Sequence, residues 1–456
     1  MTPAAHRAIA GHRAINGHRV FTEGFYRSDD HDYEVRVLLG HAVHGASDVG
    51  EVLEAIATVA DGDREGWFRA WTELGTALVA RGDASAAAGH PLSAAQAYLR
   101  ASVYLGVAVN AVGPGDESRP TDQSRPGDQS RPGDESELGD QSRPGDQSGP
   151  GDESVLLRAF RAHRAAWDSF VDAGPLAVDR VAIPYEGATL PGYFVRAAGT
   201  GGAAGPRRTL IIVNGSDGSI ASAWADAGVG ALARGYNVLL FDGPGQQSQL
   251  FERNTFFRPD WEAVLTPVVD FLLARTDVDG ARLAVYGISQ GGYWVPRALA
   301  FEHRIAAGVA DPGVVDVSAS WTASIPRPLL KLAQEGEHAK FDREMALGLK
   351  FSKDTARTWA FRARPYGADG YAATLAEVRT YTLGAVAAQI STPLLITSPE
   401  DEQFWPGQSQ RLAELAPTVS TVVPFTAEDG ANFHCQPMAR ALTVQRVFDW
   451  LDEQLA

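Results

Sequence analysis

Hydrophobic residues follow a helical period through the first third of the chain. From Tyr33 to about residue 109 the apolar positions recur at helical spacing, and one stripe contains Trp67 and Trp71. The same period resumes at Val155 and continues for another helix. Apolar stripes of this kind face the core of helical domains. The pattern therefore predicts an N-terminal helical domain over residues 31–175.

The period changes at residue 181, where short apolar runs begin to alternate with helical stretches. The expected strands span residues 181–185, 190–195, 209–213, 237–241, 283–286, 305–309, 393–397 and 419–424, and the expected helices span residues 221–234, 261–274, 293–300, 408–416 and 439–454. This order predicts an α/β fold with a doubly wound, mostly parallel sheet in a catalytic domain at residues 176–456. Helical residues 316–388 interrupt the order, and we interpret them as a lid insertion.

Two segments lack any apolar period. Residues 1–30 predict a disordered leader, in which the six-residue spacing of His6, His12 and His18 leaves a metal-binding tail as the alternative. Residues 114–154 repeat a six-residue unit of the type PGDQSR. Because that unit has no apolar face, we expect a disordered acidic insertion that interrupts the helical domain.

Composition narrows the class of protein. The formal net charge of −16 argues against a nucleic-acid partner, and no apolar stretch is long enough for a membrane span. The N-terminal residues lack the apolar region of a signal peptide. The single cysteine, Cys435, excludes an intramolecular disulfide and fits a reducing compartment. We therefore expect a cytoplasmic protein that has no membrane span and no nucleic-acid partner.

The stretch from Leu283 to Tyr293 combines a short strand, a glycine-bounded turn and the start of a helix. Its centre, residues 287–291, reads G-I-S-Q-G, the G-x-S-x-G pattern of a nucleophile elbow. A strained turn of this kind excludes bulky side chains two residues before and after the serine, so glycines occupy both positions. Ser289 is therefore the candidate nucleophile.

Two backbone N–H groups are expected to bind an oxyanion. The first belongs to Gln290, which follows the nucleophile at a helix start. The second is expected in the loop at residues 214–219, and Ser216 is our candidate donor. Asp217 lies beside it, and the sequence leaves two roles open. It binds a polar group of the substrate, or it caps the following helix.

The general base is expected near the end of the chain. In enzymes with such an elbow, the acid follows the nucleophile and the histidine follows the acid. His434 is the only histidine downstream of Asp401, and it lies between the last expected strand and the final helix. We expect it to accept the proton of Ser289. Its neighbour Cys435 is interpreted as a packed residue.

The acid has two candidates in the sequence. Asp401 follows the strand at residues 393–397, and Asp311 follows the strand at residues 305–309. We favour Asp401, because the Pro-Gly pair after Asp311 explains an aspartate as part of a turn. Glu400 and Glu402 flank Asp401 and are interpreted as loop charges with no role.

Five motifs together resemble one group of α/β-hydrolases: IPYEGATLPGY, NGSDGS, FDGPGQ, GISQGG and DGANFHC. The group contains fermentation/respiration-switch-like esterases, 2,6-dihydroxypseudooxynicotine hydrolase and fungal polyketide-shortening hydrolases. The resemblance implies a triad of Ser289, Asp401 and His434, no cofactor or metal, a site under the helical domain and often a homodimer. Asp217 falls where some members carry an acidic residue. Gln247 and Asn214 depart from the pattern near the mouth of the site, which leaves the substrate open.

We therefore expect a serine hydrolase that cleaves a C–C bond beside a carbonyl, or an ester bond, in a small aromatic or polyketide-like substrate. Two other classes stay open. An acyltransferase or cyclase would use the same triad with a nucleophile other than water, and product analysis separates it. A non-catalytic interaction protein would use the fold and the acidic repeat as a scaffold, and covalent labelling by a fluorophosphonate separates it.

Overall fold

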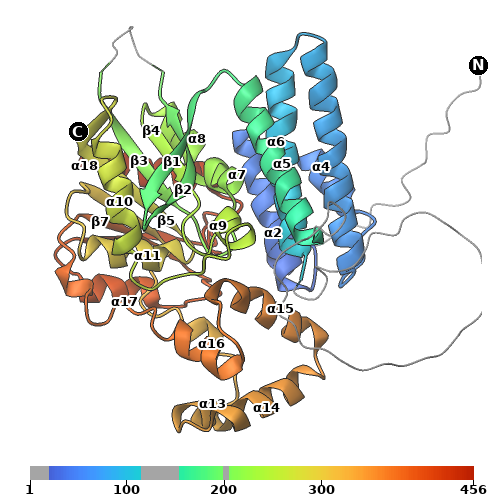
Figure 1. The fold of residues 1–456 in the computed structure, drawn as a ribbon, viewed down its shortest axis with the longest axis vertical. Helices are drawn as coiled ribbons and strands as arrows, with labels where there is room; N and C mark the ends of the chain where they lie inside the picture. The colour runs from blue at the N-terminus through green and yellow to red at the C-terminus, as the bar shows by residue number, and fades with distance from the viewer. Residues whose placement is uncertain (1–19, 114–153, 199–204) are drawn as a thin grey trace, which may run out of the picture.

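A computed structural model describes residues 20–113, 154–198 and 205–456 of the chain (Figure 1). Residues 1–19 and the repeat at residues 114–153 lie outside the described residues, so the disordered leader and the disordered insertion stay predictions. Within the expected leader, helix α1 (Val20–Glu23) is formed and helix α2 begins at Asp29. The helical region thus begins earlier than expected.

Eight strands form one sheet in the order β1-β2-β4-β3-β5-β6-β7-β8. Strands β1 and β2 form the predicted hairpin, and β2 also pairs antiparallel with β4. The other pairs are parallel, which confirms the α/β fold with a mostly parallel sheet. The strands are β1 (Ala177–Tyr185), β2 (Ala188–Arg196), β3 (Arg207–Val213), β4 (Asn237–Phe241), β5 (Val278–Ile288), β6 (Ala307–Asp311), β7 (Leu394–Pro399) and β8 (Ser420–Phe425).

Helices cover both faces of the sheet, and residues along each strand alternate between two cores. In β3, Leu210 and Ile212 belong to one core, and Ile211 belongs to the other. The first core contains side chains of α7 (Ile220–Ala223), α8 (Val229–Ala233) and α18 (Arg440–Gln454), and the second contains those of α10 (Glu262–Leu273), α11 (Gly291–Leu299) and α17 (Gln408–Leu415). A π-helical turn at Trp224–Gly228 joins α7 to α8.

The N-terminal helices form a bundle beside the sheet (Figure 1). Its members are α2 (Asp29–His41), α3 (Val49–Ile56), α4 (Arg64–Ala87), α5 (Pro91–Ala111) and α6 (Val155–Ala173). Helix α5 packs between α4 and α6. Buried bundle residues such as Trp71 and Trp167 belong to the same core as the first face of the sheet. The bundle is therefore fixed relative to the catalytic region by a shared core.

Five α-helices and two short 3-10 helices occupy the chain between β6 and β7, where we expected the lid insertion. The α-helices are α12 (Ala319–Thr322), α13 (Arg327–Gln334), α14 (His338–Leu349), α15 (Lys353–Ala363) and α16 (Tyr371–Val378). Helix α15 lies near the lower end of the bundle (Figure 1). Its Arg357 side chain donates a hydrogen bond to the carbonyl of Ala111 at the end of α5. Among the helices described, none has the length and apolar character that a membrane span needs.

Candidate active site

Ser289 lies at the sharp turn between β5 and α11 and has a positive φ of 55°. Residues other than glycine rarely adopt this conformation, and such strain is typical of functional turns. Both glycines of the motif are required, because neither position has room for a Cβ. A Cβ on Gly287 would overlap the carbonyl of Gly291, and a Cβ on Gly291 would overlap that of Val213. The Ser289 N–H donates to the carbonyl of Asp311 at 2.6 Å, which ties the turn to β6. The turn therefore has the form of a nucleophile elbow.

His434 joins the serine to a carboxylate. Its Nε2 lies 2.9 Å from Ser289 Oγ, and its Nδ1 lies 2.8 and 2.9 Å from the two carboxylate oxygens of Glu402. The side chains of His434 and Glu402 are only 2% and 5% exposed, so the histidine–carboxylate pair is shielded from bulk water. The serine thus has a base within reach, and the base has an acid that orients it.

The environment of Glu402 keeps its carboxylate ionised. Burial acts to raise the pKa of Glu402, but His434 and hydrogen bonds to the charged form outweigh burial and lower the pKa overall. Two of these bonds come from the backbone N–H groups of Phe404 at 3.0 Å and Trp405 at 3.2 Å. A carboxylate held in this state stabilises the imidazolium that forms when His434 accepts a proton.

The prediction that Asp401 orients His434 is wrong. The Asp401 carboxylate is exposed and accepts a hydrogen bond from the Asn432 side chain at 2.6 Å. The backbone at Asp401 pairs with Phe433 in an isolated parallel bridge. Because successive side chains of extended backbone point to opposite sides, Asp401 points away from His434 and Glu402 points toward it. The sequence shows three consecutive carboxylates here and no signal for which side each would face, so Glu402 was missed.

The alternative acid, Asp311, is fully buried and faces other partners. Its carboxylate accepts hydrogen bonds from Tyr286 Oη and Thr397 Oγ1, each at 2.6 Å, and from Gln436 Nε2 at 3.0 Å. Its carbonyl also accepts from the Cys435 thiol at 3.1 Å, so Cys435 is a packed residue as predicted. Asp311 therefore stabilises the surroundings of the site, because its hydrogen bonds join β5, β7 and the loop that carries the histidine.

The expected oxyanion donors, Ser216 and Gln290, both line the cavity that contains Ser289. Within the described residues, neither backbone N–H donates to a protein acceptor. The loop after β3 is braced by the Asn214 side chain, which bonds to two backbone groups of the same loop at 2.6 and 2.9 Å. Gly215 lies so close to the nucleophile that a Cβ there would be 2.9 Å from Ser289 Cβ. The two N–H groups are thus free to bind an oxyanion.

Asp217 lines the cavity and does not cap the next helix. The N-cap of α7 is Ser219, whose Oγ accepts from the N–H of Ser222 at 3.1 Å. The Asp217 carboxylate accepts a hydrogen bond from the Ser216 hydroxyl at 3.3 Å, and enclosure by the cavity walls raises its pKa. Of the two roles that the sequence left open, the structure excludes the helix cap, and contact with a polar substrate group stays a prediction.

A cavity of about 610 Å³ contains the serine and the histidine. Helices α2 and α5 of the bundle, helix α15 of the insertion and the loops of the sheet all contribute to its walls. This size is typical of small-molecule sites. Gln247, one of the two departures from the family pattern, lines the cavity, and its Oε1 is buried without a partner among the described residues. Those residues include no cluster of His, Cys, Asp or Glu that could hold a metal ion.

Glu34 of α2 is one of several acidic residues that line the cavity besides Asp217. Burial and then the neighbouring charges of Asp217, Asp30 and Asp226 raise the pKa of Glu34 to about 8. A carboxyl group with this pKa is largely protonated at neutral pH and donates a hydrogen bond. The sequence contained no signal for this residue, because it lies in a helix whose pattern indicated only a core-facing stripe.

Comparisons with known proteins identify the family of the chain. Residues 210–440 match the sequence model of the alpha/beta hydrolase family. Hydrolase LUC6 of a Fusarium species is 28% identical over 440 residues, which cover 92% of this chain and 96% of the relative. The 20-hydroxy-prefusarin hydrolase FUS2 of Gibberella moniliformis is 29% identical over 303 residues, which cover 64% of this chain and 62% of the relative.

Among solved structures, 2,6-dihydroxy-pseudo-oxynicotine hydrolase is similar over nearly the whole chain. The TM-score is 0.65 at 17% sequence identity, and the match covers 91% of this chain and 95% of that one. At this level of identity the similarity concerns the fold. It includes the N-terminal helices as well as the sheet, since the matched share exceeds the catalytic region.

Proposed function

The chain belongs to the alpha/beta hydrolase family, and on that premise we propose that it is a serine hydrolase with a Ser289–His434–Glu402 triad. The observation that carries this proposal is the continuous path of contacts from Ser289 Oγ through both ring nitrogens of His434 to Glu402. Ser289 and His434 line the 610 Å³ cavity, where a substrate carbonyl can approach the serine.

The geometry supports a two-step reaction. Ser289 Oγ attacks the substrate carbonyl while His434 Nε2 takes the hydroxyl proton, and Glu402 stabilises the imidazolium. The N–H groups of Ser216 and Gln290 bind the oxyanion. His434 then gives the proton to the leaving oxygen or carbon. His434 next takes a proton from water, which attacks the acyl-enzyme, and returns that proton to Ser289 Oγ as the acyl–Oγ bond breaks and the carboxylic acid leaves.

The cavity favours a small substrate that carries hydroxyl groups beside its reactive carbonyl. Glu34 and Asp217 present carboxyl groups within the cavity, and such groups form hydrogen bonds with hydroxyls. The relative from Gibberella moniliformis is named as a hydrolase of a 20-hydroxy compound, and the solved structure is named for a 2,6-dihydroxy compound. We propose a hydroxylated aromatic or polyketide-like ketone or ester, cleaved at the C–C or ester bond next to its carbonyl.

Replacing the nucleophile tests the proposal. A fluorophosphonate should label the protein at Ser289, and Ser289→Ala should lower kcat on p-nitrophenyl acetate by about 10³–10⁶-fold with an unchanged melting temperature. The matched control is Ser169→Ala, which removes a hydroxyl from α6 outside the cavity. Near-normal turnover by a folded Ser289→Ala variant would refute the proposal.

A further inference from the structure

One face of helix α2 lies directly against the loop that carries His434. The Tyr33 hydroxyl donates to the backbone carbonyl of His434 at 3.1 Å. One turn along, the guanidinium of Arg36 lies 4.7 Å from the ring centre of Phe433. Another turn along, Gly40 packs so tightly that a Cβ would overlap the carbonyl oxygen of Pro437. Residues at this spacing share one side of a helix.

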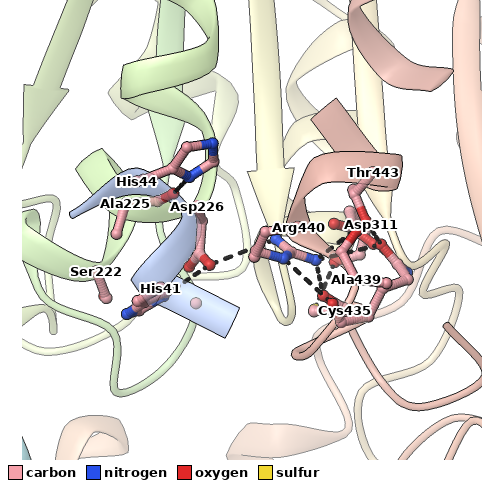
Figure 2. A network of polar contacts seen from close by, with 12 residues as sticks. His41, His44, Ser222, Ala225, Asp226, Asp311, Cys435, Ala439, Arg440 and Thr443 are labelled. Carbon is pink, nitrogen blue, oxygen red and sulfur yellow. Dashed lines mark hydrogen bonds and ion pairs between the residues drawn. The ribbon is translucent and has the colours of Figure 1, made fainter. Parts of the chain in front are cut away.

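The same helix reaches the loop a second time through buried charges (Figure 2). His41 Nε2 lies 3.0 Å from Asp226 Oδ1, which lies 3.4 Å from Nη1 of Arg440. Arg440 is 2% exposed, and its guanidinium donates to the carbonyl of Cys435 and, at 3.2 Å, to that of Gln436. The chain of contacts therefore runs from α2 to the two residues that follow the histidine.

Those two residues have strained backbone. Cys435 and Gln436 have positive φ values of 52° and 45°, a conformation that residues other than glycine rarely adopt. Strained backbone of this kind persists only where the surroundings enforce it. Here Arg440 holds both carbonyls, and Tyr33 holds the carbonyl of His434 just before them. The direction of the His434 side chain depends on this stretch of backbone.

We propose that α2 is a positioning element of the active site, with Tyr33 as the residue that fixes the backbone of His434 toward Ser289. The inference rests on the proposed function, because it concerns how the general base is held for proton transfer. Tyr33 acts through the His434 carbonyl, and Arg440 acts through the two carbonyls that follow. The N-terminal bundle therefore contributes to the rate of the chemical step in addition to enclosing the substrate.

Tyr33→Phe tests this role, because it removes only the hydroxyl and keeps the ring. Loss of one orienting hydrogen bond should lower kcat on p-nitrophenyl acetate about 5- to 10-fold, with KM within about twofold of wild type. Labelling of Ser289 by a fluorophosphonate should slow by the same factor, since labelling requires the activated serine. The matched control is Tyr26→Phe. Tyr26 donates to the carbonyls of Ile56 and Val59, away from the histidine, so both rates should stay at the wild-type value.

Gly40→Ala provides a second variant. The added methyl group must separate α2 from Pro437, so kcat and the labelling rate should fall further than in Tyr33→Phe. Its control is Gly348→Ala in α14, where a Cβ meets open space. If Gly40→Ala does not fold, the comparison of Tyr33→Phe with Tyr26→Phe decides alone.

Two results would overturn the inference while leaving the proposed function intact. One is labelling of Tyr33→Phe at the wild-type rate. The other is a change confined to KM, which would make Tyr33 a substrate contact. Failure of the wild-type protein to react with the fluorophosphonate would instead overturn the proposed function, and this inference with it.

Discussion

The direction of one side chain decides which carboxylate serves His434. Glu402 and Asp401 are adjacent in sequence, yet only Glu402 contacts the imidazole, at 2.8 Å, and Asp401 faces outward toward Asn432. Residues 400–402 after β7 are all acidic, so the sequence does not show which of the three side chains faces His434. The glycine-bounded turn pointed to Ser289, and chain order pointed to His434 as the single histidine after the candidate acid. The acid could not be identified in this way, because residue spacing does not show toward which side of the backbone each carboxylate points.

Exchanging each carboxylate for its amide separates the two residues. Glu402→Gln should lower kcat by about 10³–10⁴-fold, the order expected when the acid of a triad is made neutral. Asp401→Asn keeps the shape of an exposed side chain and should change kcat by less than about threefold. Steady-state rates on one p-nitrophenyl ester compare both variants. A crippled Asp401→Asn beside an active Glu402→Gln would reverse our assignment.

Glu34 predicts a pH dependence of stability. Its pKa is raised from 4.5 to about 8 in the folded protein, first by burial and then by Asp217. Between these values the folded state holds a proton that the unfolded state has lost. Stability from this group is therefore full below pH 4.5 and falls as the pH rises to 8, by at most about 1.4 kcal/mol per pH unit.

Glu34→Gln removes this titration. The difference in melting temperature, variant minus wild type, should increase from pH 5 to pH 8 and stay constant above pH 8. The control is Glu65→Gln on the exposed side of α4, which should run parallel to wild type. Parallel curves for Glu34→Gln would show that Glu34 ionises normally in the folded protein.

At the scale of elements, helices α5 and α6 form a hairpin whose connecting segment is the acidic repeat. Val109 and Val112 at the end of α5 share a small apolar cluster with Leu156 and Phe160 at the start of α6. The two helix ends therefore lie together through their own packing. A connection of any length that spans this short gap can join them.

We expect the repeat to be dispensable for folding and catalysis. Replacing residues 114–153 with a short Gly/Ser linker should leave kcat unchanged and should raise the free energy of unfolding by no more than about 1–2 kcal/mol, because a shorter loop costs less entropy to close. Thermal unfolding and ester hydrolysis measure the two quantities. A scrambled repeat of equal length is the control. A large loss of activity in the linker variant alone would show that the repeat packs on the enzyme.

At the scale of the whole molecule, local periodicity predicted the architecture well. The alternation of strands and helices after residue 181 predicted the parallel sheet, since central strands such as β4 are apolar runs buried on both faces, as two covering helical layers require. The elbow at Ser289 followed from glycines that leave no room for a Cβ. Contacts between distant segments were beyond the sequence. Tyr33 and His434 are 401 residues apart, and no period in either segment indicates the other.

Helix α2 contacts both the cavity and the loop that carries His434, and this double contact affects how the protein can evolve. Its residue Glu34 lines the cavity, and the adjacent Tyr33 holds the histidine loop. A substitution in α2 that suits a new substrate would therefore also affect His434, the proposed general base, and we expect substrate range and turnover to change together in this part of the chain. Gln247 and the Arg362 side chain of α15 line the same cavity without contacting that loop. We expect substitutions at these two positions to change the substrate range without disturbing the position of His434.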